Sequence, residues 1–372
     1  MKQITCFHLL NDYSGSPRVL NSVISGFIKR GYKIDLITSD TEGFLSEFKN
    51  NSQVRYHTYK YSFSNKKFFT AINYIYAQIY LMICSLRCRK RDTIIWINTI
   101  LPIGAAIIGY LMNKKIICHY HEDAQTKGNI YTILSSIIQK TASYIICVSD
   151  YQKNKIRRDF NICTIPNSLS IEFETASIEK TYSDKFLYKR ILMLASLKKY
   201  KGIDSFVKLA HLLPEFSFML IINDTIDNIN EYLSGNNSKI PSNLKIIDRQ
   251  KNTLRYYQSS SLVVNLSDKN LFVETFGLTA LEAMSMGLPC IVPTIGGIAE
   301  LVEDGVNGYK IDVQQLNLIA DTIKMIHSDK DLYIKLSKNA QNKFQEFSHD
   351  SMMRKIIKVI DSVDPDFNSG KA

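Results

Sequence analysis

Short apolar runs alternate with longer amphipathic stretches along most of this 372-residue chain. The short runs are rich in Ile, Val, Leu and Phe and end at polar or turn-forming residues, which is typical of buried strands. The stretches between them place apolar residues three and four positions apart, which predicts helices. This alternation favours parallel sheets covered by helices on both faces.

The predicted strands fall into two series separated by a polar segment. In the first half they span residues 3–9, 33–38, 54–58, 93–98, 115–120, 144–148 and 163–165. In the second half they span 191–194, 217–222, 244–248, 262–265 and 290–292. Helices are predicted between them, including 17–30, 128–141, 202–213, 252–259, 277–286 and 299–302, and the chain is expected to be helical after Asp312.

A chain of this length is expected to form two domains, because domains average about 150 residues. We predict two doubly wound, Rossmann-like α/β domains facing across a cleft, one over residues 1–170 and one over 186–348. The polar, weakly periodic segment 168–185 is expected to link them. Residues 349–372 are predicted to form a C-terminal helix and tail that pack back towards the N-terminal domain.

Charge is distributed unevenly between the two halves. The formal net charge is +11, and counting side chains gives +10 for residues 1–185 and +1 for 186–372. A localised positive field favours an anionic partner, whether nucleic acid, anionic lipid or a phosphorylated substrate. No RNA-binding or zinc-finger motif accompanies the basic half, so we expect no nucleic-acid partner. The ordinary apolar content excludes a disordered chain, a collagen and a small disulfide scaffold.

Cysteines and acidic residues give no sign of a metal site. The seven cysteines are scattered, form no CxxC pair and have no zinc spacing with histidines, so we expect reduced, buried thiols in a cytosolic protein. Asp364 and Asp366 have the spacing of a DxD metal motif, but they lie in the polar tail and follow no strand. We therefore expect no metal requirement.

Two long uncharged stretches raise the question of a membrane. Residues 93–112 divide better into a strand and a helix that begins near Pro102. Residues 69–86 are rich in tyrosine and are followed by a basic cluster at 87–91. A spanning helix is possible by length, but a buried or interfacial helix is favoured, because tyrosine rings and basic residues suit a bilayer surface. The N-terminus lacks the features of a secretory signal peptide.

The segment 272–307 carries the most specific chemistry. Gly277 stands where a helix should begin after a strand, so that the amides of Gly277, Leu278 and Thr279 would point outward with the positive helix end behind them. This arrangement suits a diphosphate. Glu282 lies one turn further on, where it can accept two hydrogen bonds from a ribose diol, and Glu274 can reach the hydroxyls of a second sugar. Each feature alone is explained by ordinary capping, but their order favours a binding site.

Three other parts of the chain precede or follow strands in ways that suit the same chemistry. Lys201 stands near the end of a strand, before Gly202 and a helix, where its charge can neutralise a phosphate. His119 and His121 alternate along a strand and should point the same way. The pair Gly296 and Gly297 forms a second tight loop that allows backbone contact with a ligand.

These residues resemble the EX7E segment of retaining, family-4 type glycosyltransferases of the GT-B fold. The matching positions are Glu274, Phe276, Gly277, Glu282, Ala283, Met284, Gly287, Pro289, Gly296, Gly297, Glu300, Gly305 and Gly308. The resemblance implies that the segment binds a nucleotide-sugar donor. It also implies that Glu282 holds the ribose, that Glu274 contacts the transferred sugar, and that Phe276, Gly277 and Leu278 belong to the donor site.

The resemblance extends to other parts of the chain. Residues 195–202 resemble the family's donor loop, in which Lys201 matches the lysine that neutralises the diphosphate, whereas Ser196 stands where the family often has Arg. Gly15 lies in a shortened version of the glycine-rich first loop, which in the family approaches donor or acceptor, so the resemblance implies a role for Gly15 in the donor site, although an ordinary turn explains it equally well. His121, followed by Glu122, matches a histidine that projects towards the transferred sugar and is favoured over His119 for that role.

The sequence thus predicts a hexosyltransferase with Glu274, His121 and Lys201 as catalytic residues, a nucleoside-diphosphate sugar as donor substrate and no cofactor. The basic N-terminal half suggests a lipid-linked oligosaccharide acceptor in bacterial surface-polysaccharide synthesis (O-antigen, capsule or lipopolysaccharide). It also suggests a cytoplasmic protein held peripherally at the inner face of the membrane. Two alternatives stay open, a GT-B-fold sugar-nucleotide epimerase and a non-catalytic nucleotide-sugar binding module. The sequence gives no indication of oligomeric state.

Overall fold

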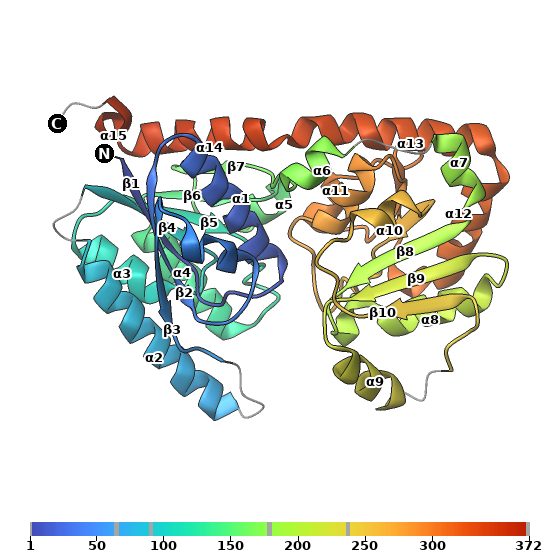
Figure 1. Ribbon diagram of the computed structural model, residues 1–372, viewed down its shortest axis with the longest axis horizontal. Helices are drawn as coiled ribbons and strands as arrows, with labels where there is room; N and C mark the ends of the chain where they lie inside the picture. The colour runs from blue at the N-terminus through green and yellow to red at the C-terminus, as the bar shows by residue number, and fades with distance from the viewer. Residues whose placement is uncertain (1, 63–66, 89–91, 177–180, 236–238, 370–372) are drawn as a thin grey trace. The chain divides into compact units, whose positions relative to one another are not determined.

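The computed structural model describes residues 2–62, 67–88, 92–176, 181–235 and 239–369. It divides into two compact units. The first combines Met1–Ser168 with His349–Ala372, and the second is Leu169–Ser348. Each unit is built on its own parallel sheet (Figure 1). The predicted α/β class with two doubly wound domains is thereby confirmed.

The N-terminal unit contains a seven-stranded sheet. Its strands are β1 (Gln3–Phe7), β2 (Lys33–Ser39), β3 (Val54–Tyr59), β4 (Thr93–Asn98), β5 (Ile116–Tyr120), β6 (Tyr144–Cys147) and β7 (Ile162–Thr164). Its helices are α1 (Gly15–Lys29), η1 (Phe44–Asn50), α2 (Lys67–Leu86), α3 (Ile103–Leu111), α4 (Asn129–Thr141), α5 (Asp150–Lys153), α14 (His349–Val363) and α15 (Pro365–Ser369). The strand order is β3-β2-β1-β4-β5-β6-β7.

Helices cover both faces of this sheet, as the strand order requires. The chain moves in one direction from β1 to β2 and in the other from β4 through β6. Because such crossovers are right-handed, α1 is placed on one face and α3 and α4 on the other. Helix α2 packs on α3 and α3 on α4, whereas α1 packs on α14 (Figure 1). Strands β4 and β5 are fully buried between these layers, which explains their continuous apolar sequence.

The second unit contains a six-stranded sheet. Its strands are β8 (Arg190–Ala195), β9 (Ser217–Ile222), β10 (Leu244–Ile247), β11 (Leu262–Val264), β12 (Cys290–Val292) and β13 (Gly308–Lys310). Its helices are α6 (Ile171–Thr175), α7 (Tyr182–Leu187), η2 (Lys199–Lys201), α8 (Ile203–Leu212), α9 (Ile226–Gly235), α10 (Leu254–Gln258), α11 (Leu278–Ser285), η3 (Gly297–Glu300), η4 (Val313–Gln315), α12 (Leu316–Ser328), α13 (Lys330–Phe344) and η5 (Gln345–Phe347). The strand order is β10-β9-β8-β11-β12-β13.

The segment expected to be an irregular linker contains two short helices, α6 and α7, in its described part. Phe173 is buried and packs edge-on against Tyr257, which anchors α6. Lys185 is almost completely buried, and its ammonium donates to the carbonyl oxygen of Met286 at 2.7 Å. That carbonyl is at the C-terminal end of α11, where a positive charge is favourable. Burial lowers the pKa of Lys185 to about 8. These tertiary contacts could not be predicted from the polar composition of the segment.

His327 lies in the core of the second unit on α12. One ring nitrogen, Nδ1, is 3.0 Å from the carbonyl oxygen of Ile323, and Nε2 is 2.8 Å from the hydroxyl of Ser261. The ring stacks on Phe186 with 6.2 Å between centroids. Burial lowers the pKa of His327 from 6.5 to about 4, an effect that the hydrogen bond to Ile323 partly opposes. The native unit therefore contains the neutral imidazole at pH 7.

We predict that this histidine makes the second unit sensitive to acid. The unfolded chain binds its proton near pH 6.5, whereas the folded unit resists protonation to about pH 4. The stabilisation is therefore complete above pH 6.5 and is lost as the pH falls towards 4, with a total on the order of 3 kcal/mol. Urea unfolding of the wild type and His327→Gln at pH 7 and pH 4.5 measures this. The difference in unfolding free energy between them should shrink at the lower pH, and an unchanged difference would contradict the assignment.

Candidate active site

The order of strands in the second unit reverses at β8 and β11. From β8 the chain proceeds to β9 on one side, while β11 lies on the other side and leads to β12. The connections that follow β8 and β11 therefore diverge, and the helices α8 and α11 begin close to this point. In open parallel sheets ligands bind outside the carboxyl ends of the strands at such a reversal. The predicted donor residues Lys201, Glu274 and Gly277 all belong to these two connections.

Gly277 caps the N-terminus of α11, as the sequence predicts. Its φ of 99° is in the left-handed region, and an added Cβ would lie 2.4 Å from Cγ1 of Ile298. Glycine is therefore required here both for backbone conformation and for space. The first turn that follows contains no acidic side chain. Leu278 and Thr279 are partly exposed, and their amides belong to the helix end that has no intrahelical acceptor. This end suits an anionic group.

Lys201 and Glu274 form an ion pair. The ammonium nitrogen of Lys201 lies 2.5 Å from Oε1 of Glu274, and each side chain is 16% exposed. Lys201 also lies 4.1 Å from the ring centroid of Phe272, which stacks on Tyr200. Gly202 permits this arrangement, because an added Cβ would lie 2.2 Å from the carbonyl oxygen of Leu266. The turn at Lys201 is thereby held against the connection that follows β11.

Glu274 is kept ionised by its neighbours. Burial by itself would raise the pKa of this carboxyl, but the charge of Lys201 and three hydrogen bonds together lower it. The donors are Lys201, the hydroxyl of Ser267 at 2.9 Å and the amide of Asn265 at 3.4 Å, and all three reach Oε1. Because these three donors fix Oε1, the direction of the second oxygen, Oε2, is fixed as well. Such an oxygen can accept a hydrogen bond from a sugar hydroxyl.

Glu282 is buried in the body of α11, with 1% of its surface exposed. Its Oε2 accepts a hydrogen bond of 2.5 Å from the hydroxyl of Tyr257, which is itself completely buried. A buried carboxylate needs such donors, because an unpaired one would be strongly destabilising. Tyr257 therefore fixes the rotamer of Glu282, the residue predicted to hold a ribose.

The remaining predicted donor residues support the backbone of the site. Phe276 is buried, and its ring packs edge-on against Phe347 at 6.2 Å between centroids. Ser196 follows β8 and is partly exposed, and its carbonyl accepts from the amide of Lys198 at 2.7 Å. The Gly296–Gly297 loop packs on the backbone of Glu274, since the amide of Gly297 donates to the Glu274 carbonyl at 2.8 Å. The loop therefore supports the connection that carries Glu274, and its predicted contact with a ligand stays a prediction.

Three histidines and one asparagine gather where β1, β4 and β5 of the N-terminal unit end. The rings of His119 and His121 lie 4.3 Å apart, so the two side chains point the same way, as the strand period predicts. His121 Nε2 lies 3.1 Å from Oδ1 of the buried Asn98. The Nδ2 atom of Asn98 lies 3.1 Å from Nδ1 of His8 and donates to the carbonyl oxygen of Ser16 at 3.2 Å.

The contacts of Asn98 define the tautomer of His121. Because the amide nitrogen of Asn98 is directed at His8 and Ser16, its oxygen is directed at His121 and accepts from Nε2–H. Burial lowers the pKa of His121 well below 6.5, and the neighbouring imidazoles and Lys127 act in the same direction. His121 is therefore a neutral imidazole at pH 7, protonated on Nε2. In this tautomer Nδ1 is the acceptor atom of the ring.

A strained turn lies beside these histidines. Thr99 has a φ of 73°, which is unusual for a β-branched residue. Its amide donates to the carbonyl of His119 at 2.9 Å, and the next amide, that of Ile100, donates to the Glu122 carboxylate at 3.1 Å. Burial raises the pKa of Glu122, although Lys127 and the backbone donors oppose this. Glu122 thus stabilises a strained backbone beside His121, and strain of this kind clusters at functional sites.

Gly15 begins α1 close to the end of β1. It is exposed and does not have a positive φ, so its conformation does not require glycine. Its predicted role in donor binding rests on its position alone. No group of three or more His, Cys, Asp or Glu suited to a metal ion occurs within the described residues.

Sequence reasoning missed several residues that hold the site in place. Tyr257, Asn265 and Phe272 contact the predicted residues on the donor side, and Asn98 does so beside His121. Only the two asparagines carry a signal in the sequence, because each is a polar residue that ends an apolar strand. Tyr257 and Phe272 have ordinary aromatic positions, and their roles depend on tertiary contacts.

Comparisons with known proteins agree with this geometry. Residues 13–173 match the family model described as Glycosyltransferase Family 4, and residues 182–343 match the model described as Glycosyl transferases group 1. The two matched ranges together cover most of the chain. The chain belongs to the family 4 glycosyltransferases. The first matched range lies almost wholly in the N-terminal unit and the second in the C-terminal unit.

Individual relatives of this glycosyltransferase are distant. N-acetyl-alpha-D-glucosaminyl L-malate synthase of Bacillus anthracis is 24% identical over 53% of this chain and 52% of its own length. A probable sucrose-phosphate synthase of Oryza sativa is 27% identical over 42% of this chain and 16% of its own length. The chain thus spans about half or less of the length of these curated relatives.

Solved structures show that the fold is the GT-B fold. HepE of Anabaena in complex with UDP and glucose aligns with a TM-score of 0.80 at 16% identity, over 97% of this chain and all of that one. The lipopolysaccharide outer core galactosyltransferase WaaB aligns with a TM-score of 0.67 at 16% identity, over 97% of this chain and 99% of that one. At such identities the likeness establishes the fold alone.

We predict that Asn98 controls the protonation of His121. Long-range ¹H–¹⁵N NMR spectra of the glycosyltransferase with ¹⁵N-labelled histidine should show His121 neutral at pH 6.5, with its proton on Nε2. In Asn98→Asp the added carboxylate favours the imidazolium, so the pKa of His121 should rise. Assignment uses His121→Gln, and circular dichroism verifies folding. A neutral His121 with its proton on Nδ1 would contradict the tautomer assignment, and titration near pH 6.5 in the wild type would contradict the lowered pKa.

Proposed function

We propose that this glycosyltransferase moves a hexosyl unit from a nucleoside-diphosphate sugar to an acceptor hydroxyl, with retention of configuration at the anomeric carbon. The observation that carries the proposal is the pairing of Lys201 with Glu274 beside the Gly277-capped end of α11. Cationic and main-chain donors there suit a diphosphate, and a fixed carboxylate suits sugar hydroxyls.

In this proposal the C-terminal unit binds the donor, as predicted for residues 186–348. Lys201 and the first amides of α11 receive the diphosphate, Glu282 receives the ribose, and Glu274 receives the transferred hexose. Ser196 and Phe276 complete the donor site, through hydroxyl contact and loop support respectively. HepE, which shares the fold, was crystallised with UDP-glucose, and uridine nucleotides are therefore the first donors to test. The N-terminal unit binds the acceptor, as predicted for residues 1–170, and His121 and Gly15 are the residues of that unit proposed to contact the substrates.

The proposed reaction takes place on one face of the sugar. The bond between the anomeric carbon and the diphosphate oxygen breaks, and the acceptor oxygen forms a new bond to the same carbon. The acceptor proton passes to the departing diphosphate oxygen. The protein positions the two substrates and stabilises the charge that develops on the diphosphate, chiefly through Lys201. His121 is suited to accept a hydrogen bond from a sugar hydroxyl, because its imidazole is neutral.

We further propose that the acceptor is a lipid-linked oligosaccharide of bacterial surface-polysaccharide synthesis and that the protein acts at the inner face of the cytoplasmic membrane. The support is an exposed apolar face on α2. Its large side chains, each about half exposed or more, lie three or four residues apart along the helix. They are Phe68, Phe69, Ile72, Ile75, Tyr76, Ile79, Ile83 and Leu86. The segment Phe68–Leu86 is long and apolar enough to cross a membrane. Only 28% of its most apolar window is buried, so most of that window is exposed on the surface of the unit.

The opposite face of α2 argues for an interfacial rather than a spanning helix. Ala77 and Leu81 are buried in the core of the N-terminal unit. The side chain of Gln78 accepts from the amide of Gly104 at 2.8 Å, and the hydroxyl of Tyr74 donates to the carbonyl of Leu101 at 2.8 Å. A helix held in this way can present only its outer face to lipid. The charge of +10 on residues 1–185 favours an anionic bilayer. Arg87 lies at the end of α2, whereas residues 89–91 of the basic cluster lie outside the described residues.

We predict that Lys201→Ala, Glu274→Ala and Glu282→Ala each abolish most transfer. Loss of the Lys201 charge should lower turnover by about 10²–10³-fold, the range typical of a lost electrostatic group in an active site. Donors are identified first from a panel of nucleoside-diphosphate sugars, because a specific ligand raises the melting temperature. Transfer is then followed with the radiolabelled donor, and the anomeric configuration of the product is read by NMR.

Lys208→Ala is the matched control, because this exposed lysine lies on α8 in the same unit but outside the donor loop. It should leave turnover within about threefold of the wild type. Incubation of the donor alone separates transfer from epimerisation, since an epimerase would isomerise the free nucleotide sugar. Near-normal turnover in Glu282→Ala, or an isomerised donor, would count against the proposal.

We predict that the outer face of α2 binds anionic vesicles. Sedimentation with vesicles of phosphatidylglycerol and phosphatidylcholine should retain the protein at low salt and release part of it at high salt. Ile72→Glu combined with Ile79→Glu places two charges at the interface and should reduce binding at least tenfold. Leu318→Glu, an equally exposed site on α12, is the control and should bind normally. Equal binding by the double variant and the wild type would exclude this face.

A further inference from the structure

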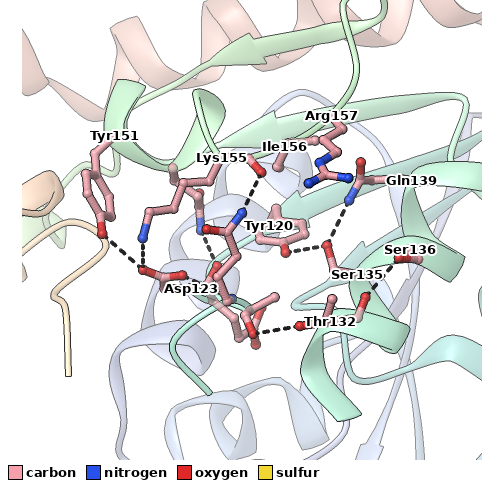
Figure 2. A pocket seen from close by; sticks show the side chains of 14 residues that line it. Tyr120, Asp123, Thr132, Ser135, Ser136, Gln139, Tyr151, Lys155, Ile156 and Arg157 are labelled. Atoms are coloured by element: carbon pink, nitrogen blue, oxygen red, sulfur yellow. Dashed lines mark hydrogen bonds and ion pairs between the residues drawn. The ribbon is translucent and has the colours of Figure 1, made fainter. Parts of the chain in front are cut away.

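A cavity of about 410 Å³ lies within the N-terminal unit, beyond the end of β5 and between α4 and α5 (Figure 2). This volume is within the range of about 300–1,000 Å³ typical of small-molecule sites. All its lining residues fall between Tyr120 and Arg157, so the cavity belongs to the N-terminal unit alone. None of them is among the residues predicted to bind the donor.

One wall of the cavity is made of hydroxyl and amide groups. The hydroxyl of Tyr120 donates to Oγ of Ser135 at 2.7 Å, and the side chain of Gln139 donates to the same oxygen at 3.0 Å. Thr132 and Ser136 lie on the same face of α4 and are exposed (Figure 2). The hydroxyls of Thr132 and Ser136 donate to the carbonyls of Gly128 and Thr132 at 3.4 and 3.0 Å, so their oxygens keep acceptor capacity for the hydroxyls of a carbohydrate.

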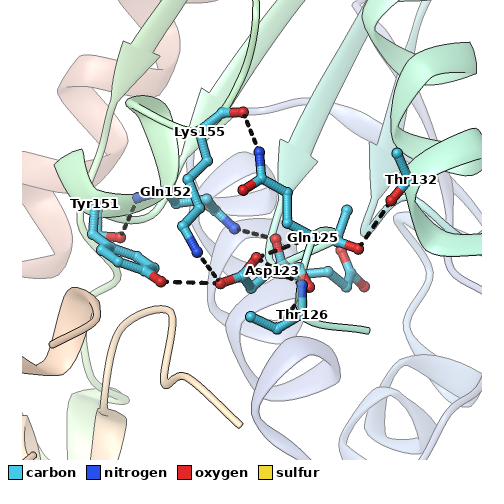
Figure 3. A network of polar contacts seen from close by, with 10 residues as sticks. Asp123, Gln125, Thr126, Thr132, Tyr151, Gln152 and Lys155 are labelled. Carbon is cyan, nitrogen blue, oxygen red and sulfur yellow. Dashed lines mark hydrogen bonds and ion pairs between the residues drawn. The ribbon is translucent and has the colours of Figure 1, made fainter. Parts of the chain in front are cut away.

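Charged groups form the opposite wall, where they neutralise one another. Asp123 is buried, and its Oδ2 accepts from the ammonium of Lys155 at 2.6 Å and from the hydroxyl of Tyr151 at 3.2 Å (Figure 3). Its Oδ1 accepts from the amide of Gln125 at 3.2 Å. The lining contains two carboxylates, Asp123 and Glu122, and two cations, Lys155 and Arg157. Such a balanced lining favours an uncharged polar ligand over a phosphate.

We infer that this cavity binds a sugar residue of the acceptor. The inference rests on the proposed function, and it adds the site and the residues that recognise the acceptor. Tyr120 and His121 are consecutive at the end of β5, and Tyr120 lines the cavity while His121 contacts Asn98. Glu122, the residue after His121, also lines the cavity, so the cavity borders the histidine expected beside the reacting sugar on both sides along the chain.

The helix that lines the cavity also carries an apolar surface. Ile130 and Ile133 of α4 are 70% and 59% exposed, whereas Leu134 and Ile138 are buried in the core. Thr132 and Ser136 lie between these faces, on the side of the cavity. A single helix thus combines a polar face for a saccharide with an exposed apolar face suited to lipid. This combination fits an acceptor in which a sugar is attached to a lipid.

The test uses a printed array of mono- to tetrasaccharides carrying hexoses, N-acetylhexosamines, deoxyhexoses and uronic acids. Fluorescently labelled full-length protein should bind at least one class of saccharide. Thr132→Trp fills the cavity from an exposed helix position and should reduce that binding at least tenfold. Ser136→Trp, one turn further along α4, should have the same effect. Both variants should keep the rise in melting temperature that the donor produces in the wild type, because the donor residues lie in the other unit.

Lys140→Trp is the matched control, since it adds the same bulk to the same helix outside the cavity. It should bind the array like the wild type. Equal array binding by Thr132→Trp, Ser136→Trp and the wild type would overturn the inference. So would the absence of any saccharide binding by a wild type that still responds to a nucleotide sugar, and in that case the proposed function would stand. A protein that responds to no nucleotide sugar would instead contradict the proposed function.

Discussion

The ion pair between Lys201 and Glu274 is the contact around which the donor-side residues are arranged. It joins the connection after β8 to the connection after β11, at the place where the strand order reverses. Both side chains are mostly buried, and burying either charge without the other would be strongly destabilising. The ion pair therefore holds the two connections together. Gly202 and Gly277 allow the two backbones to approach closely, and the loop at Gly296 closes behind Glu274. The geometry of the site therefore follows from charge pairing and close backbone packing.

The N-terminal unit orders its polar groups by hydrogen bonding rather than by charge. Asn98 connects His8 and His121 at the ends of three neighbouring strands, and burial keeps the imidazoles neutral. A side-chain amide donates through its nitrogen and accepts through its oxygen, so Asn98 can bond to two imidazoles in opposite roles. An ionised carboxylate could only accept. The two units thus present different chemistry, a charged cluster suited to a diphosphate and a neutral cluster suited to sugar hydroxyls.

Much of the fold could be predicted from the sequence, because buried parallel strands have continuous apolar sequences and helices have a clear period. The capping role of Gly277 was also predictable, since it stands between a strand and a helix. Strand β13 was missed because its three residues, Gly308–Lys310, carry too short a pattern. The helices of segment 168–185 were missed because they depend on the burial of Phe173 and Lys185. Tyr257 was missed for the same reason, since only tertiary contact brings its hydroxyl to Glu282.

Helix α4 illustrates how one element can serve folding and recognition together. Leu134 and Ile138 attach it to the core of the N-terminal unit. The exposed Ile130 and Ile133 add nothing to that core, and exposed apolar side chains that recur at helical spacing indicate a surface in contact with another apolar phase. Helices α2, α3 and α4 pack side by side on the same face of the sheet, so their exposed apolar residues share one side of the unit. Since α4 also lines the cavity, a lipid held against that side would bring its attached sugar close to the end of β5.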